Sequence, residues 1–315
     1  MEDTFRARAT SSTRYLPRHL GTALILAMLA FAFGCNQNRA KAVTEMNKGI
    51  EAYQSGQNIT AVKYLKAAKS TDPTFAEPAL YLGQLYHRQL SELDNAEQAY
   101  REALQRDPEN AEIHYKLGAV LSDKSNHEMA AQQYQQAVQK APNDAKSWFR
   151  LGLSQKKLGE NAQAVESFMK SIRANARMKM DEEDPGGAAY HALGDLYTAY
   201  GFYDKALQVY DNGVLNNGDV ARLYAGRGVA QLKLKRFQEA ANSFKKALEL
   251  DPKHVSATFN LAVAHNELGE HDAAIGVLET YLTRSEDQVR RSAAQGLLQT
   301  LKSEKEKAAT KQAGK

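Results

Sequence analysis

The 315-residue sequence contains a single cysteine, Cys35, together with only seven prolines and one tryptophan. One cysteine cannot form an internal disulfide, and it cannot build a cysteine-based zinc site. A composition that is 43% apolar and 25% charged argues against a long disordered chain. Few prolines favour helices, and the length suggests two domains at about 150 residues per domain.

Long apolar runs and a strong charge of one sign are also missing. Lys and Arg number 41 against 37 Asp and Glu, so the net charge is only +4. Because nucleic-acid binders usually carry a clustered basic excess, we expect no nucleic-acid partner. The apolar run at residues 20–34 is shorter than the ~20 residues that a membrane-spanning helix needs, and we therefore exclude a multi-span membrane protein.

The first 34 residues have the features of a secretory signal. Four arginines precede the apolar run, which ends in Ala32-Phe33-Gly34-Cys35. A basic segment, a short apolar segment and a small residue before a cleavage site are typical of a signal peptide. This run resembles the lipobox of bacterial lipoproteins, in which a small residue precedes a cysteine that is lipidated and becomes the new N-terminus.

The lipobox resemblance implies a signal peptide at residues 1–34, lipidation of Cys35 and a short tether at residues 35–41. Ala32 stands where the family usually has leucine, and bulky Phe33 follows it. An uncleaved N-terminal anchor and an ordinary cleaved signal are the alternatives. Two or more acyl chains would hold the protein on the lipid bilayer. Asn36, rather than aspartate, follows the cysteine and favours the periplasmic face of the outer membrane in the bacterial cell envelope.

Prolines and glycines keep one common period along the rest of the chain. Pro73, Pro108, Pro142 and Pro252 are spaced by 35, 34 and 110 residues. Spacings of 34, 35, 34, 42 and 34 separate Gly49, Gly83, Gly118, Gly152, Gly194 and Gly228. Both series carry the same excess of eight residues at the same place. A period of 34 residues is the signature of tetratricopeptide (TPR) repeats, and the sequence resembles that family from residue 42 to about residue 288.

The TPR resemblance implies an all-α fold, a right-handed TPR superhelix or α-solenoid of about seven helix-turn-helix repeats with a C-terminal capping helix. The expected repeats are residues 42–75, 76–110, 111–144, 145–178, 187–220, 221–254 and 255–288. Residues 179–186 form an insert, and repeat two has one extra residue around 93–95. We expect a capping helix at residues 289–301 and a disordered basic tail at residues 302–315.

In this family, six positions of each repeat face a concave groove that binds partners. The residues expected there are Tyr81, His87, Arg88, Tyr115, Lys116, Lys146, Phe149, Arg150, Lys156 and Lys157. A basic groove with aromatic residues favours an extended or helical peptide that carries acidic and apolar residues. The alternative is that these are ordinary solvated side chains.

Some TPR co-chaperones hold a C-terminal carboxylate with a clamp of Lys, Asn and Arg residues. Lys146 and Arg150 match one part of that clamp. The other clamp positions hold Leu80, Gln84 and Lys116, so the sequence predicts that the clamp is absent.

No motif for catalysis, a cofactor or a metal stands out. Gly226-Arg227-Gly228 lacks the third glycine of a dinucleotide-binding loop. His265 and His271 lack the spacing of a zinc site, and the acidic run 181–184 lacks the alternation of a calcium loop. We therefore predict no enzyme activity, no cofactor, no metal and no small-molecule substrate.

The pattern as a whole favours a non-catalytic scaffold, anchored to a membrane, that binds partner proteins in the cell envelope. Its layout resembles that of type IV pilus assembly lipoproteins, which help a secretin ring to form. A soluble TPR co-chaperone or adaptor is one alternative. A non-catalytic subunit of an envelope enzyme complex is another.

Overall fold

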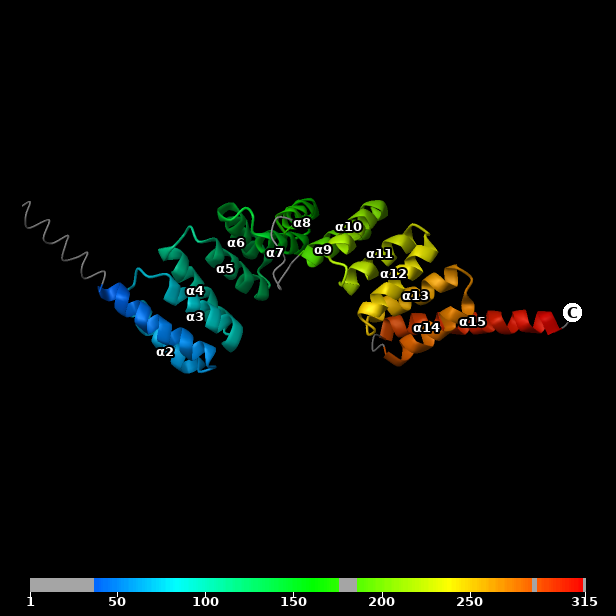
Figure 1. Cartoon of the computed structure of the whole chain (residues 1–315), viewed down its shortest axis with the longest axis horizontal. Helices are drawn as coiled ribbons and strands as arrows, with labels where there is room; N and C mark the ends of the chain where they lie inside the picture. The colour runs from blue at the N-terminus through cyan, green and yellow to red at the C-terminus, as the bar shows by residue number, and fades with distance from the viewer. Residues whose placement is uncertain (1–36, 176–185, 285–287, 314–315) are drawn as a thin grey trace, which may run out of the picture. The chain divides into compact units, whose positions relative to one another are not determined.

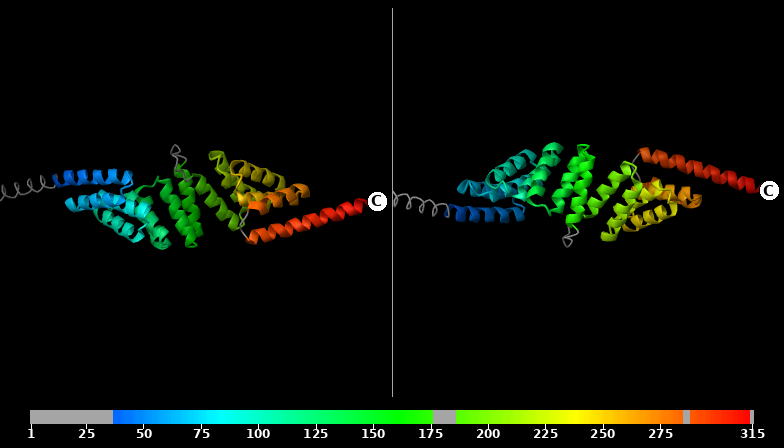
Figure 2. Two further views of the ribbon diagram at one scale, coloured as in Figure 1. Left: turned by 90° about the horizontal axis from the view of Figure 1, so that it is seen from below. Right: turned by 90° about the horizontal axis from the view of Figure 1, so that it is seen from above.

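The computed structural model describes residues 37–175, 186–284 and 288–313, and these residues form helices and turns without a strand. The chain divides into two compact units, Met1–Pro108 and Glu109–Lys315. Each unit consists of antiparallel helix pairs stacked side by side (Figures 1 and 2). The fold is an all-α TPR solenoid, as the sequence predicts. The 34-residue period by itself does not indicate the division after Pro108.

Unit 1 holds the first two repeats. Its first described helix covers residues 37–54, and the helices after it are α2 (Asn58–Thr71), α3 (Glu77–Leu85), η1 (Tyr86–Leu90) and α4 (Leu93–Arg106). Leu65, Leu82 and Leu85 are buried in one cluster between these helices. Arg39 at the start of the first helix pairs with the buried carboxylate of Asp72 at 2.5 Å. This ion pair joins the start of the first helix to the end of α2, opposite the turn that connects the two helices.

Unit 2 holds the remaining repeats. Its helices are α5 (Ala111–Asp123), α6 (His127–Lys140), α7 (Ala145–Lys157), α8 (Asn161–Asn175), α9 (Gly186–Ala199), α10 (Tyr203–Asn216), α11 (Ala221–Lys233), α12 (Phe237–Leu250), α13 (Val255–Glu267), α14 (His271–Arg284) and α15 (Gln288–Ala313). The odd-numbered helices α5 to α13 are the A helices of successive repeats, and the even-numbered helices are the B helices.

Successive A helices of unit 2 contact one another directly, from α5 to α7, α9, α11 and α13. Their B helices pack mainly on A helices instead. A stack whose A helices lie closest together is curved toward them. We call the side chains that α5, α7, α9, α11 and α13 present on this inner side the A-helix face.

A close approach between glycine and an aromatic ring joins the two helices of a repeat. A Cβ atom on Gly118, Gly152, Gly194 or Gly228 would lie between 2.5 and 2.9 Å from the nearest ring atom of the B helix. The rings belong to Tyr134, Phe168, Tyr210 and Phe244, and all four are buried. Close packing therefore explains why the sequence repeats glycine at the eighth position and an aromatic residue at the twenty-fourth.

The extra residue of repeat two is absorbed earlier than the sequence predicts. It is accommodated by the π-helical turn η1 at Tyr86–Leu90 and not around residues 93–95. The turn ends at Ser91, whose φ of 54° is left-handed. A π turn widens a helix by one residue without breaking it, so α4 keeps its contact with α3.

The N-terminal expectation of a tether at residues 35–41 is wrong for residues 37–41, which are already helical. These residues continue into the first helix of repeat one, and Arg39 anchors them through Asp72 and the ring of Phe75 at 4.3 Å. Helical backbone rises only about 1.5 Å per residue, less than half of the extended value. Residues 1–36, which include the signal segment and Cys35, lie outside the described residues. Residues 176–185, which include most of the expected insert, lie outside them as well.

The tail expected to be disordered at residues 302–315 is helical as far as Ala313, so the cap is longer than residues 289–301. Leu301 is buried against α14. Beyond it, Lys302 pairs with Glu279 at 2.7 Å and Lys305 with Asp272 at 2.5 Å. Low apolar content predicts disorder, whereas here the helix continues past its apolar face and its lysines pair with acidic residues of α14.

The glycine contacts predict opposite effects of two Gly→Ala substitutions in unit 2. Gly152→Ala should destabilise the protein by about 1–3 kcal/mol, because its Cβ would lie 2.7 Å from Phe168 Cδ1. Gly276→Ala in α14 should stabilise it by about 0.5–1 kcal/mol, because nothing lies within 4 Å and alanine favours the helix. Urea denaturation followed by circular dichroism measures both. Equal stabilities would contradict the packing explanation.

Candidate protein-binding site

The predicted groove residues of unit 1 do not form a regular row. Tyr81 on α3 is half-buried and packs against the core around Leu82. His87 and Arg88 lie in the π turn η1, where the register of an A helix is already broken. His87 is half-buried and Arg88 is exposed. Tyr81, His87 and Arg88 lie in unit 1, and the other predicted groove residues lie in unit 2.

In unit 2, α5 contributes Tyr115 and Lys116 to the A-helix face. The Tyr115 ring packs on Tyr134, with ring centroids 5.8 Å apart. Lys116 pairs with Glu112 one turn earlier at 3.2 Å, and its side chain is only 17% exposed. Lys116 is thus engaged within its own helix, whereas Tyr115 is half-buried at the surface.

Five predicted residues lie together on α7. Phe149 is half-buried and packs on Phe168 at 6.0 Å between ring centroids. Lys146 is half-buried, whereas Arg150, Lys156 and Lys157 are exposed. The last two stand in the final turn, where the helix dipole favours cations.

Polar contacts hold α7 in place at its N-terminal end. The carboxylate of Asp144 caps its N-terminus by accepting hydrogen bonds from the backbone of Lys146 and Ser147, each at 3.2 Å. Ser171 on α8 donates to the carbonyl of Ala145 at 2.8 Å. The exposed side chains of α7 thus project from a backbone that is fixed at its first turn.

The structure adds a polar cluster that the sequence analysis missed, on α9 and α10. Tyr210 Oη donates to Asp195 Oδ1 at 2.7 Å, and His191 Nδ1 lies 3.2 Å from Asp195 Oδ2. The His191 and Tyr210 rings meet edge to face at 6.3 Å. His191 stands at the fifth position of its repeat, as Tyr115 and Phe149 do in theirs, and that shared position was the signal available in the sequence.

Cations surround this cluster. Burial lowers the pKa of His191. Arg222 on α11, Lys156 on α7 and His254 before α13 lower it further, whereas Asp195 raises it. The positive charges of Lys156 and Arg222, from the two neighbouring repeats, therefore act on one point of the A-helix face.

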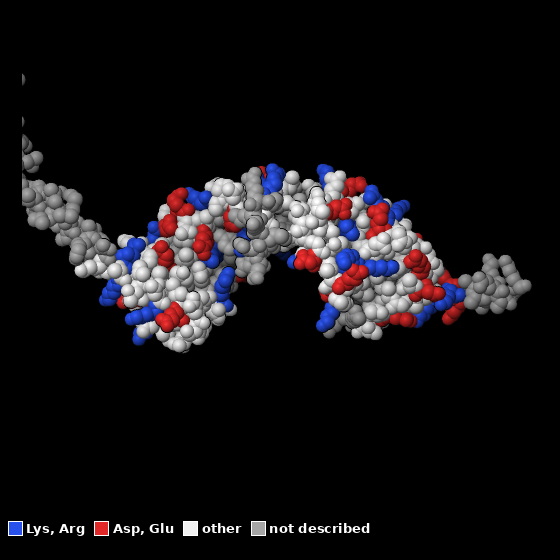
Figure 3. All heavy atoms as spheres, viewed as in Figure 1, with Lys and Arg blue, Asp and Glu red and all other residues white. Residues whose placement is uncertain are grey.

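Charges of both signs are interspersed on the face seen in Figure 3, where no large area is of one sign. Such a surface does not provide the continuous basic stripe that tracks a nucleic-acid backbone.

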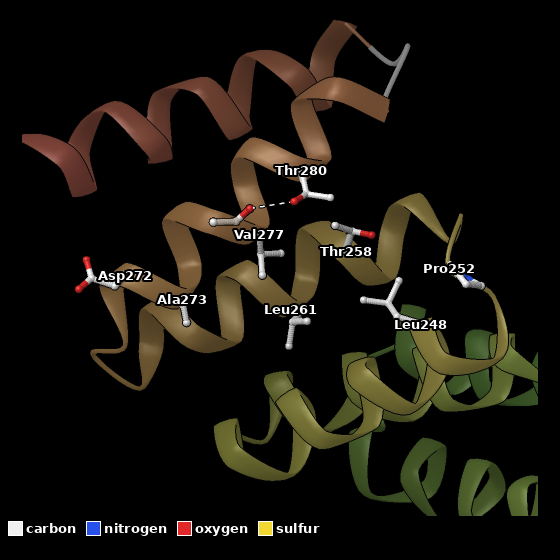
Figure 4. A pocket seen from close by; sticks show the side chains of 9 residues that line it. Leu248, Pro252, Thr258, Leu261, Asp272, Ala273, Val277 and Thr280 are labelled. Carbon is white, nitrogen blue, oxygen red and sulfur yellow. Dashed lines mark hydrogen bonds between the residues drawn. The ribbon is translucent and has the colours of Figure 1, made fainter.

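A pocket of about 490 Å³ lies between the B helices α12 and α14, over α13 (Figure 4). Leu248, Leu261 and Val277 form much of its apolar wall. Ala273 and Gly276 on α14 also line it, and larger polar residues, Glu239 and Asn242, occupy the corresponding positions of α12. No predicted site residue lines this pocket.

One of the two histidines considered as metal ligands, His265, has another role. His265 is buried and pairs with Glu270 across the α13–α14 turn. Within the described part of the chain, no group of three or more His, Cys, Asp or Glu residues has the arrangement of a metal site. No helix within residues 37–175, 186–284 and 288–313 has both the length and the apolar character needed to cross a bilayer.

Family comparisons agree with the repeats. Models described as tetratricopeptide repeat or TPR repeat match residues 87–125, 111–144, 134–166, 187–253 and 227–289. Together these residues make up more than half of the chain.

Two curated human proteins are similar over part of their length. The mitochondrial import receptor subunit TOM70 is 34% identical over 98 residues, which are 30% of this chain and 16% of that protein. The protein O-mannosyl-transferase TMTC3 is 28% identical over 188 residues, 56% of this chain and 20% of that protein. The chain thus spans a fifth or less of these relatives.

Among solved structures, that of pilF from Pseudomonas aeruginosa is similar, with a TM-score of 0.55 and 24% identity. The match covers 71% of this chain and 96% of that one. At this identity the likeness shows the fold.

The Asp195 cluster yields a prediction that separates its two contacts. Asp195→Ala should lower stability by about 1–3 kcal/mol, because it leaves the buried Tyr210 hydroxyl without its acceptor. It should also lower the pKa of His191 further, because the one neighbour that raises this pKa is lost. Urea denaturation and an NMR titration of the His191 ring test the two effects.

Asp211→Ala is the matched control, because Asp211 is an exposed acid that lies 3.6 Å from Arg227. It should change stability by less than about 1 kcal/mol. An unchanged or higher pKa of His191 in the Asp195 variant would contradict the prediction.

Proposed function

Because this chain belongs to the tetratricopeptide repeat family, we propose that it is a non-catalytic scaffold that binds partner proteins through its A-helix face. We propose further that it works at a membrane of the bacterial cell envelope, held there by lipid on Cys35. TPR repeats form extended surfaces for protein ligands, and the import receptor named above is one similar protein.

The observation that carries the binding proposal is the surface of α7. Arg150, Lys156 and Lys157 extend into solvent, and none of the three forms an ion pair within the described residues. Phe149 on the same helix and Tyr115 on the neighbouring α5 are half-buried, each resting on a buried ring. The face thus combines unpaired cations with preorganised aromatic rings.

This combination fits an acidic and apolar segment of a partner protein. A few residues carry most of the binding energy in protein interfaces, and Trp, Tyr and Arg are enriched among them. Rings that are already held against a buried neighbour lose little freedom when a ligand covers them. Cations that have no internal partner gain more from a ligand carboxylate than cations that must first break an ion pair.

The membrane proposal rests on the position of the only cysteine. Cys35 follows a short apolar run and precedes helical residues that are described from residue 37 onward. Two residues span about 7 Å at most. A lipid on Cys35 would therefore place the first repeat at the bilayer surface, and we favour the periplasmic face of the outer membrane.

The finer role proposed is assistance in assembling an envelope complex, such as a type IV pilus or its secretin. The alternative is a soluble co-chaperone or adaptor, or a non-catalytic subunit of an envelope enzyme complex. Lipidation distinguishes the first of these alternatives from the proposal.

Partner capture tests the A-helix face. We expect the combined variant Arg150→Glu, Lys156→Glu, Lys157→Glu to lose at least about tenfold in the recovery of crosslinked partners, because it reverses the unpaired charges. These side chains are exposed, so the fold should be retained. A second variant, with Tyr115, Phe149 and Arg150 all changed to Ala, tests the rings.

The matched control changes exposed residues on the B helices of the same two repeats, Gln132, Met169 and Arg173, to Ala. It should retain every partner. If the charge-reversed variant also retains every partner, the A-helix face is not the binding surface.

Lipidation has a direct test in bacterial cells. Metabolic labelling with a palmitate analogue should mark the wild-type protein and leave Cys35→Ser unlabelled, because the variant has no other thiol. The labelled protein should sediment with membranes. Absence of label in the wild type would refute the lipoprotein proposal.

A further inference from the structure

One buried hydroxyl on unit 2 has no hydrogen-bond partner. The Tyr134 side chain is 0% exposed, and its Oη atom lacks a donor or acceptor neighbour within the described residues. Buried polar atoms are almost always hydrogen-bonded, so an exception calls for an explanation.

The chain itself shows what completes such a site two repeats later. Tyr134 and Tyr210 occupy the same position, each packed against the glycine sixteen residues earlier, Gly118 or Gly194. Tyr210 Oη donates to the carboxylate of Asp195, the residue after its glycine. The corresponding residue of the earlier repeat is Ala119, which has no acceptor. The Tyr134 hydroxyl therefore lacks the carboxylate that the Tyr210 hydroxyl has.

A cation lies near the Tyr134 hydroxyl. Sixteen residues after each tyrosine, on the next A helix, the chain has Arg150 in one case and Gly226 in the other. A Cβ atom on Gly226 would lie 2.7 Å from Tyr210 Oη, so this position adjoins the hydroxyl end of the ring. Burial raises the pKa of Tyr134, and the charge of Arg150 acts against that rise.

We propose that Tyr134 Oη and the Arg150 guanidinium together bind one carboxylate of the partner segment, between α5 and α7. The partner would supply in trans the group that Asp195 supplies within its own repeat. This inference rests on the proposed function and adds Tyr134 as the residue that selects an acidic side chain at a defined point of the A-helix face.

The chemistry of the two donors fits this role. A carboxylate accepts hydrogen bonds on both oxygens, so it can take one from the phenol and one or two from the guanidinium. The Tyr134 oxygen is closed off from solvent, whereas Arg150 is exposed, so binding requires the side chains that cover the Tyr134 oxygen to move when the ligand carboxylate enters. Asp123 is the acidic residue of α5 that acts on Tyr134, and it is exposed.

The test uses Tyr134→Phe, with Tyr210→Phe as the matched control. Each removes one hydroxyl from the same position of a repeat. Binding is measured by fluorescence polarisation with a labelled peptide of leucine, phenylalanine and aspartate, chosen as the tightest from an array that varies the aspartate position. The second probe is the same peptide with asparagine in place of each aspartate.

We expect Tyr134→Phe to weaken the aspartate peptide about tenfold and to leave the asparagine peptide within about twofold. Tyr210→Phe should leave both within about twofold. In thermal denaturation, Tyr134→Phe should melt no lower than the wild type, because the hydroxyl that it removes has no partner. Tyr210→Phe should melt lower, because Asp195 loses its donor.

Three results would overturn the inference. In the first, Tyr134→Phe binds the aspartate peptide as tightly as the wild type. In the second, it melts as low as Tyr210→Phe, which would mean that the hydroxyl has an internal partner. In the third, the wild type binds no peptide of the array, and the proposed function falls as well. The first result overturns only this inference if the charge-reversed α7 variant still fails to bind the peptide.

Discussion

The close approach of A and B helices at a missing side chain is the constraint on which the rest of this structure depends. Where Gly152 leaves out a Cβ, the ring of Phe168 fills the space. That contact sets the separation of the two helices and turns the ring toward the inner side of the stack. Phe149 and its counterparts Tyr115 and His191 then rest on those rings. The proposed binding surface is thus a second layer, supported by the packing beneath it.

The repeats could be predicted from sequence because the packing constraint recurs at a fixed interval. Departures from the interval were harder to locate. The extra residue near α4 was detectable as a shift in spacing, but its accommodation at Tyr86–Leu90 depends on where a helix most easily widens. In the helical tail after Leu301, lysines pair with Glu279 and Asp272, which are distant in sequence. Local composition carries no information about such partners.

The candidate site was predicted in part. Fixed positions in the repeat gave the residues of α7 directly, because a periodic helix presents the same positions to the same side. The pattern did not indicate that Lys116 pairs within its helix or that Tyr210 has an acceptor where Tyr134 has none. Those differences depend on whether a neighbour's side chain reaches a given atom, and repeats with the same pattern differ in this. Here equivalent positions therefore have different chemistry.

The helix α15 has a consequence for how the chain behaves in a crowded compartment. In a stack of identical modules, the last module exposes the same apolar surface that its predecessors bury, and such a surface can accept a module from another molecule. Leu297, Leu298 and Leu301 cover that surface around Phe259 and Tyr281. The charged continuation of α15 has no apolar face to offer in turn. The helix therefore covers the surface on which a further repeat would stack, and a repeat from another molecule would have to displace it first.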